Sequence, residues 1–308
     1  MTKVPLYLKP GDIIGILAPA GYMSYERMQP CIKALQSWGY RVTTGPTTQS
    51  LSQNYFSGTD EERLADLQAM LDDKHIKAIL CARGGYGMSR IIDALNFKKF
   101  KKNPKWIVGF SDITVLHSHL YAAYKIASLH SPMAAAFSSE DPEDPYVLSL
   151  RDALEGKPLN YSCEAHEFNR SGTATGYLMG GNLSILTHLI GTPSDVNMKH
   201  KILFLEDVGE YLYNIDRMLV HLKRAGKFDK LEGLIIGGFT DMKDTERPYG
   251  KSVFEIINEQ IKLIEIPYCF GFPVSHGKEN YALKIGVKCE LNITHDVVTV
   301  KELTTEEL

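Results

Sequence analysis

Short apolar runs alternate with helix-patterned segments throughout the first half of this 308-residue chain. Parallel strands need crossover connections, and a helix usually makes the crossover. Alternation of this kind, with short connections, therefore favours a parallel sheet covered by helices on both faces. The apolar runs lie at residues 12–18, 41–44, 76–81, 106–109 and 127–130. We predict that they form the sheet of an N-terminal α/β domain.

The second half follows a polar, weakly patterned stretch and is richer in strands. It opens with a strand at 172–179, a glycine turn at Gly180 and Gly181, and a helix at 182–190. Strand patterns follow at 201–206, 234–238, 269–274, 282–287, 290–294 and 297–300, and helical patterns at 211–224 and 252–264. At roughly 100–200 residues per domain, the length fits two domains. We predict an N-terminal α/β domain at 1–158, a linker at 159–170 and a C-terminal α+β domain at 171–308.

Composition argues against several classes of function. The apolar share of 44% and charged share of 23% are ordinary for globular proteins, and the formal net charge of -3 gives no reason to expect a nucleic-acid or membrane partner. The five cysteines contain no Cys-x-x-Cys pair, which argues against a disulfide framework or a structural zinc site. No apolar run has the length of a signal peptide or a membrane span, so we expect a cytoplasmic protein.

The segment from Trp106 to Thr114 combines a buried strand, a tight turn and a helix start. The strand ends at Gly109, a helical pattern begins at Asp112, and Ser111 lies on the turn between them. Such a turn lifts a hydroxyl out of the sheet and aims it at the helix N-terminus. Ser111 is therefore a candidate nucleophile, although serine is also a common helix N-cap.

A serine nucleophile needs a base and an acid that orients the base. His276 lies in a loop bounded by glycine and proline, where catalytic groups concentrate, and His130 at a strand end is a second candidate. Glu206 and Asp207 follow each other where an apolar strand stops. On chemistry alone either carboxylate could orient the base, and either could instead begin the following helix.

The same mechanism needs two backbone N–H groups to stabilise an oxyanion. One is the amide of Asp112, directly after the candidate nucleophile. The other could come from Gly84 or Gly85, because glycine lets a backbone approach a ligand closely. The chain lacks the glycine fingerprint of dinucleotide sites, the phosphate-loop motif and metal-ligand spacing, so we expect no cofactor and no metal.

Six fragments, in this order, resemble the LD-carboxypeptidase family of serine peptidases, which act on murein peptides. They span nearly the whole chain: Ile16 to Gly21, Ala82 to Gly87, Val108 to Thr114, Gly180 to Ser184, Leu205 to Asp207, and Phe272 to Gly277. Each fragment alone is weak, but the six together are specific.

The resemblance implies a catalytic triad of Ser111, Glu206 and His276, with Glu206 rather than Asp207 as the orienting acid. It implies that an N-terminal domain carries the nucleophile, that a C-terminal domain carries acid and base, and that the active site lies in the cleft between them. With the local argument it places the oxyanion donors at the amides of Gly85 and Asp112.

The expected reaction is hydrolysis of the L,D bond of a murein tetrapeptide, with release of D-alanine during cell-wall recycling. The family also implies a homodimer. Arg83 and Tyr86, beside the glycine turn, are candidates for binding substrate. One alternative is a self-immunity peptidase of the same family, which cleaves aminoacyl-nucleotide antibiotics. Another is a two-domain protein that binds a small molecule without catalysis.

Overall fold

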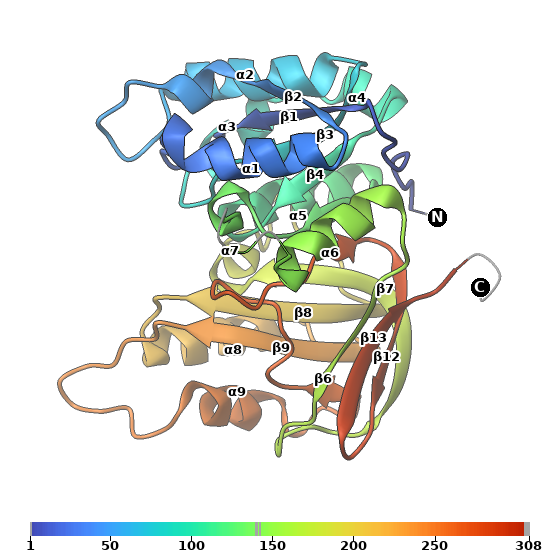
Figure 1. The fold of residues 1–308 in the computed structure, drawn as a ribbon. Helices are drawn as coiled ribbons and strands as arrows, with labels where there is room; N and C mark the ends of the chain where they lie inside the picture. Colours follow the sequence, from blue (N-terminus) through green and yellow to red (C-terminus); the bar gives the residue numbers. More distant parts are fainter. Residues whose placement is uncertain (1, 139–140, 142, 305–308) are drawn as a thin grey trace. The chain divides into compact units, whose positions relative to one another are not determined.

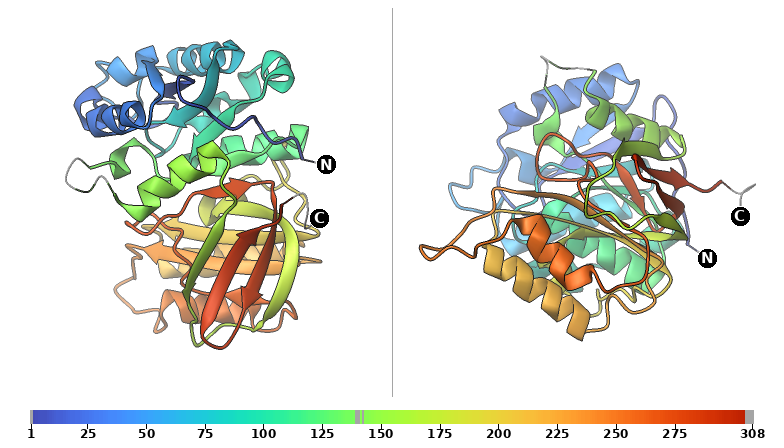
Figure 2. Two further views of the ribbon diagram at one scale, coloured as in Figure 1. Left: turned by 45° about the vertical axis from the view of Figure 1, so that its right-hand side comes forward. Right: turned by 90° about the horizontal axis from the view of Figure 1, so that it is seen from below.

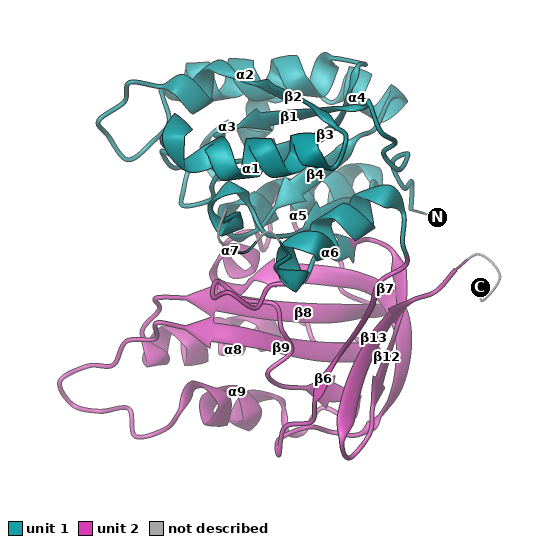
Figure 3. Ribbon diagram, in the orientation of Figure 1, with its two compact units in different colours: residues 1–157, 281–284 teal, residues 158–280, 285–308 magenta. Residues whose placement is uncertain are grey.

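The computed structural model describes residues 2–138, 141 and 143–304. Within these residues the chain divides into two compact units, coloured separately in Figure 3. Unit 1 comprises residues 1–157 and 281–284, and unit 2 comprises residues 158–280 and 285–308. The predicted class, a two-domain α/β protein, is confirmed.

Unit 1 is built on a six-stranded sheet in the order β11-β5-β4-β3-β1-β2. The pairs β1–β2, β1–β3, β3–β4 and β4–β5 are all parallel, as the alternation predicted. The strands are β1 (Ile13–Leu17), β2 (Arg41–Thr44), β3 (Ile76–Cys81), β4 (Trp106–Gly109), β5 (Ser128–His130) and β11 (Leu283–Ile285). The helices are α1 (Tyr25–Ser37), α2 (Asp60–Asp72), α3 (Met88–Ile91), α4 (Lys98–Lys102), α5 (Thr114–Tyr124) and α6 (Pro145–Glu155). Short 3-10 turns are η1 (Pro46–Gln49), η2 (Ile92–Ala94), η3 (Ser111–Ile113) and η4 (Ala134–Ala136).

Helices α1 and α2 lie on opposite faces of this sheet (Figure 1). The helix α2 begins at a capping box in which Thr59 and Glu62 exchange side-chain and backbone hydrogen bonds. Strands β3 and β4 are buried along nearly their whole length, because helices cover both faces. The carboxyl ends of these central strands therefore lie at one edge of the sheet, where ligands bind in open α/β folds.

Unit 2 is built on a seven-stranded mixed sheet in the order β10-β9-β8-β7-β12-β13-β6. Strands β7 to β10 pair in parallel, whereas β12, β13 and β6 continue the sheet in antiparallel pairs. In Figure 2, α8 and α9 lie side by side against this sheet. The strands are β6 (Asn160–Glu164), β7 (Gly172–Asn182), β8 (Lys201–Val208), β9 (Gly233–Thr240), β10 (Tyr268–Cys269), β12 (Lys288–Ile293) and β13 (Val297–Glu302). The helices are α7 (Leu183–His188), α8 (Leu212–Arg224) and α9 (Val253–Ile261).

The structure differs from the sequence expectations in four places. The strand expected at 269–274 is limited to the two residues of β10. The expected turn at Gly180 and Gly181 is part of β7, where these residues pair with Phe204 and Leu205. The stretch 159–170, expected to be a linker, holds β6, which pairs with β13. Strand β11 lies within the range assigned to the C-terminal domain, yet it joins the sheet of unit 1. A domain boundary drawn at one point along the chain does not allow for such a return.

Candidate active site

Ser111 lies at the carboxyl end of the central strand β4, on the turn that leads into α5. Its φ of 62° is in the left-handed region, which residues with a side chain seldom occupy. Such strain persists only where the surroundings enforce it, and it is concentrated at functional sites. The side chain is partly exposed, although the strand before it is buried. The turn therefore presents a hydroxyl at the sheet edge, as the sequence predicted.

A buried histidine helps to hold this turn. The imidazole Nε2 of His117 bonds the carbonyl of Gly109 over 2.8 Å, and the amide of Ser131 donates to the same oxygen over 3.3 Å. Burial lowers the pKa of His117 to about 4, although the bond to Gly109 opposes the shift. His117 is thus a neutral structural group at working pH.

The glycine turn of residues 83–87 packs directly against Ser111. A Cβ atom added to Gly84 would lie 2.8 Å from the Cβ of Ser111 and 3.1 Å from its Oγ. The carbonyl of Gly84 accepts a hydrogen bond from the amide of Gly21. Among the residues that the structure describes, the amides of Gly85 and Asp112 donate no hydrogen bond. Both remain candidates for oxyanion donors.

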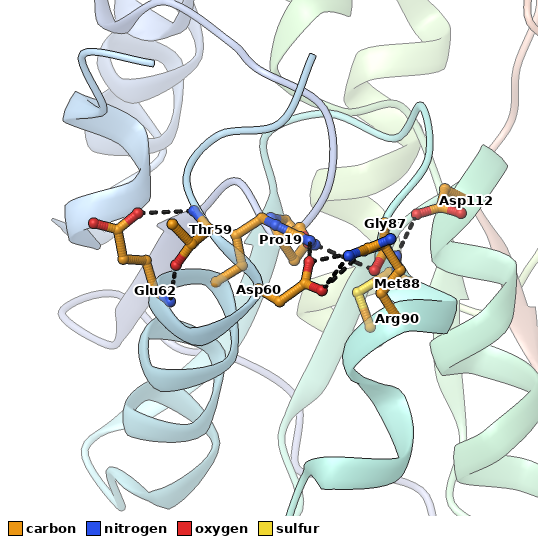
Figure 4. A network of polar contacts seen from close by, with 9 residues as sticks. Pro19, Thr59, Asp60, Glu62, Gly87, Met88, Arg90 and Asp112 are labelled. Atoms are coloured by element: carbon orange, nitrogen blue, oxygen red, sulfur yellow. Dashed lines mark hydrogen bonds and ion pairs between the residues drawn. The ribbon is translucent and has the colours of Figure 1, made fainter. Parts of the chain in front are cut away.

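The carboxylate of Asp112 connects the turn of Ser111 to Met88, the residue that follows the glycine turn. It is 1% exposed, and its Oδ2 accepts the amide of Met88 over 2.8 Å (Figure 4). Burial raises the pKa of Asp112 to about 6, against the opposing effects of the Met88 bond and the charge of Arg63.

The side chain of Arg63 is fully buried and also contacts the glycine turn. Its Nη1 donates to the carbonyls of Pro19, over 2.7 Å, and Gly87, over 3.2 Å. Its Nη2 donates to the carboxylate of Asp60. Both oxygens of this carboxylate also accept from Nε of Arg90, each over 2.9 Å (Figure 4). Sequence reasoning missed this network, because an arginine in the first turn of a capped helix is typical of a solvated surface.

In unit 2, the buried carboxylate of Glu206 pairs with the partly exposed imidazole of His276. The Nδ1 of His276 lies 2.5 Å from Oε2 of Glu206, whose side chain is 0% exposed. Burial by itself would lower the pKa of His276, but the hydrogen bond and charge of Glu206, with the charge of Asp207, raise it above its usual value. An acid in this position holds the ring and stabilises its cation.

Two glycines of β9 explain how the loop of His276 approaches the sheet so closely. The pairing of β8 with β9 shifts register between Leu205 and Asp207, so Glu206 lies at an irregularity of the ladder. A Cβ on Gly237 would lie 2.2 Å from the carbonyl oxygen of Val274, and one on Gly238 would lie 2.4 Å from the Cβ of Ser275. Any side chain there would push the loop away from the acid. Nothing in the local sequence predicted this role for the glycine pair.

Asp207, the other carboxylate of the strand end, has a different role. It accepts the side-chain amide of Asn182 over 2.8 Å and the amide of Ser184 over 3.0 Å. Both partners lie at the start of α7, so Asp207 fixes a helix to the strand. Burial, and then the charge of Glu206, raise its pKa to about 6.

The remaining candidates are placed as follows. The guanidinium of Arg83 is exposed and donates to the carbonyl of Tyr22 over 2.9 Å. Tyr86 is 46% exposed, and its ring packs on Phe56. His130 is buried, with its ring 5.7 Å from that of Phe110.

Two other kinds of site are absent from the described part of the chain. No cluster of three or more histidine, cysteine, aspartate or glutamate side chains there is arranged to hold a metal ion. No helix there has both the length and the apolar character that crossing a membrane requires. Within this part of the chain, Ser111, Gly84, Gly85 and Asp112 come together in unit 1, and Glu206 and His276 in unit 2.

Comparison with known proteins supplies the family. Residues 14–131 match the LD-carboxypeptidase N-terminal domain, and residues 175–291 match the LD-carboxypeptidase C-terminal domain. A probable murein peptide carboxypeptidase of Bacillus subtilis is 32% identical over 305 residues, which is 98% of this chain and 95% of the relative. The microcin C7 self-immunity protein of Escherichia coli is 27% identical, with 96% of each chain covered. The crystal structure of a muramoyltetrapeptide carboxypeptidase from Oxalobacter formigenes matches with a TM-score of 0.85 and 27% identity, covering 95% of this chain and 99% of that one. This chain therefore belongs to the LD-carboxypeptidase family.

Proposed function

We propose that this protein is a serine LD-carboxypeptidase that releases D-alanine from murein tetrapeptides. The observation that carries the proposal is the hydrogen-bonded pair of Glu206 and His276 over 2.5 Å, in a family member whose Ser111 occupies a strained strand–helix turn. Relatives named as murein peptide carboxypeptidases support the choice of substrate.

In the proposed mechanism, Ser111 attacks the carbonyl of the L,D bond while His276 removes its proton. Glu206 holds the imidazole and stabilises the imidazolium that forms. The amides of Gly85 and Asp112 stabilise the tetrahedral oxyanion, and the loss of one such donor typically costs about 3 kcal/mol of barrier. His276 then protonates the departing D-alanine, and water hydrolyses the acyl-enzyme. These steps need no metal and no cofactor.

A second substrate class follows from the immunity protein, which is similar over the same length. An aminoacyl-nucleotide would use the same triad but would need a surface on which its base can stack. The segment between β9 and α9 holds Tyr249 and no tryptophan. We therefore favour the murein peptide.

Stereochemistry tests the proposal most directly. Purified protein is incubated with a tetrapeptide ending in D-alanine, with the all-L diastereomer and with an aminoacyl-sulfamoyl adenosine, and products are measured by mass spectrometry. We expect alanine release from the first substrate alone, because inversion at the terminal Cα moves the carbonyl out of line with Ser111, and misplacement of about 1 Å can cost about a hundredfold.

The matched controls are the Ser111→Ala protein and a sample treated with EDTA. The variant should be inactive and the chelator without effect. Comparable rates on the two diastereomers would contradict the murein assignment. Cleavage of the adenosine compound alone would favour the immunity reaction, and loss of activity in EDTA would contradict the serine mechanism.

The family resemblance also leads us to propose a cytoplasmic homodimer. Light scattering coupled to gel filtration would test the oligomeric state, and cell fractionation would test the location.

A further inference from the structure

The side chain of Asp112 joins the two turns that carry the proposed oxyanion donors. Its own amide is one donor, and the amide of Gly85 is the other. The carboxylate accepts the amide of Met88, the first residue after the glycine turn, over 2.8 Å. Figure 4 shows this contact beside Gly87. The carboxylate is 1% exposed, so water does not compete for the bond.

The other hydrogen bonds of the glycine turn join it to residues outside the segment of Ser111. The carbonyl of Gly84 accepts from Gly21, and the carbonyl of Gly87 accepts from Arg63, which also holds Pro19. These bonds fix the turn to the loop that follows β1. Within the described residues, the hydrogen bond from Met88 to Asp112 is the one that links this turn and Met88 to the segment of Ser111.

An oxyanion site works only when both donors lie about 2.7–3.1 Å from the position that the charged oxygen will occupy. The spacing between two loops must therefore be set to within a few tenths of an ångström. A hydrogen bond to a charged carboxylate is shorter and stronger than one between neutral groups, so it suits this task. The close approach of Gly84 to Ser111 leaves little room for the loops to adjust by themselves.

We infer that the carboxylate of Asp112 is a positioning residue that sets the distance between the amides of Asp112 and Gly85. The inference rests on the proposed serine mechanism, and it gives Asp112 two separate roles. The backbone contributes a donor, and the side chain aligns the second donor. A substitution at this position leaves the backbone N–H in place, so it tests the side chain alone.

The experiment compares Asp112→Ala and Asp112→Asn with the wild type, using D-alanine release from the tetrapeptide. We expect Asp112→Ala to lower kcat about a hundredfold and to change KM less than about threefold, because a misplaced donor affects the transition state and not the ground state. We expect Asp112→Asn to restore kcat to within about tenfold of wild type, because its amide oxygen can accept from Met88.

Asp66→Ala is the matched control. Asp66 is also a buried carboxylate of unit 1, and it accepts hydrogen bonds from both the amide and the hydroxyl of Thr47. Within the described residues it has no hydrogen bond to Ser111 or the glycine turn. Both alanine variants should lower the melting temperature, while Asp66→Ala keeps kcat within about twofold of wild type.

The outcomes separate the inference from the function on which it rests. If the wild type cleaves the tetrapeptide or the aminoacyl-sulfamoyl adenosine and Asp112→Ala keeps its kcat, the positioning role is overturned and the proposed function stands. It is also overturned if the Asp66 and Asp112 variants lose kcat in proportion to their stability. A wild-type protein that cleaves neither compound overturns the serine mechanism, and this inference with it.

Discussion

Two strand ends, one in each unit, show the same arrangement of neighbouring residues. After β4, Asp112 accepts the backbone amide of Met88 at the start of α3. At the end of β8, Asp207 accepts the backbone amide of Ser184 at the start of α7. Both carboxylates are buried, and burial raises the pKa of each to about 6. In each unit the residue just before the aspartate is the proposed catalytic one.

The two ends differ in how that preceding residue is aimed. Ser111 is turned outward by a left-handed backbone and stays partly exposed. Glu206 remains in the strand, at a register shift, and its side chain is completely buried. The loop of His276 packs against it, because Gly237 and Gly238 leave room for the loop. A nucleophile must meet a substrate, whereas an orienting acid must be shielded from water. The same local arrangement thus serves opposite requirements of exposure.

Removal of the nucleophile tests the first strand end most severely. Ser111→Ala should lower turnover by about four orders of magnitude or more, as triad losses do elsewhere. Alanine can adopt the same backbone as serine, so the melting temperature should change little. D-alanine release and circular dichroism on the same samples check both points. Retention of more than about a tenth of the activity would remove Ser111 from the mechanism.

Replacement of each carboxylate at the end of β8 by its amide should separate the roles of Glu206 and Asp207. Glu206→Gln should lower kcat by about a thousandfold, because the imidazolium loses its counter-charge. Asp207→Asn should cost less than about tenfold, since an amide oxygen can still accept from Ser184. Parallel steady-state kinetics on the two variants is the measurement. Equal losses, or the reverse order, would show that the acid is wrongly assigned.

The glycine pair offers a test of the close approach that buries Glu206. Gly238→Ala should lower kcat about tenfold to a hundredfold, because the new Cβ would displace Ser275 and the adjoining His276. Gly250→Ala is the control: nothing lies within 4 Å of a Cβ there, although its φ of 86° makes alanine strained. The control should lose stability but keep its kcat. An active Gly238→Ala protein would mean that the loop has more freedom than the packing indicates.

The pH profile should show the smallest effect. His276 must be neutral to accept a proton, so kcat/KM should fall as the pH drops through its pKa, which lies above the usual 6.5. In Glu206→Gln the raising effects of the carboxylate are absent while the lowering effect of burial remains. The acid limb of the residual activity should therefore move to lower pH. A limb that stays in place would argue that another group titrates there.

Much of the fold was predictable from the sequence, because strand and helix periods in the first half are distinct. The parallel sheet of unit 1 and the strand–turn–helix at Ser111 both follow from local patterns. The turn expected at Gly180 and Gly181 was wrong, because glycine in a strand can mark close packing as well as a bend. A Cβ on Gly180 would lie 2.0 Å from the carbonyl oxygen of Phe204.

The site was less accessible to local reasoning. Alternation along a strand indicates that Glu206 and Asp207 point to opposite sides, but not which side holds the histidine. Only the family motif favoured Glu206, and the hydrogen bond to His276 involves that residue. No sequence pattern indicated that Arg63 is buried, because its partners Pro19 and Gly87 offer backbone carbonyls that any residue could provide. Contacts of a side chain with distant backbone are the hardest to infer from residue types.

Strand β11 bears on the order in which the chain can fold during synthesis. Residues 1–157 leave the ribosome first, but the sheet of unit 1 is complete only when residues 281–284 have followed all of 158–280. Until then the edge of β5 is unpaired, and an open strand edge is a template for aggregation. The buried ammonium of Lys284, which donates to the carbonyl of Lys157 over 2.9 Å, is synthesised together with β11 and so is also missing until then. A fragment that ends at residue 157 would thus resemble a nascent chain. It would expose the unpaired, aggregation-prone edge of β5 that β11 covers in the intact protein.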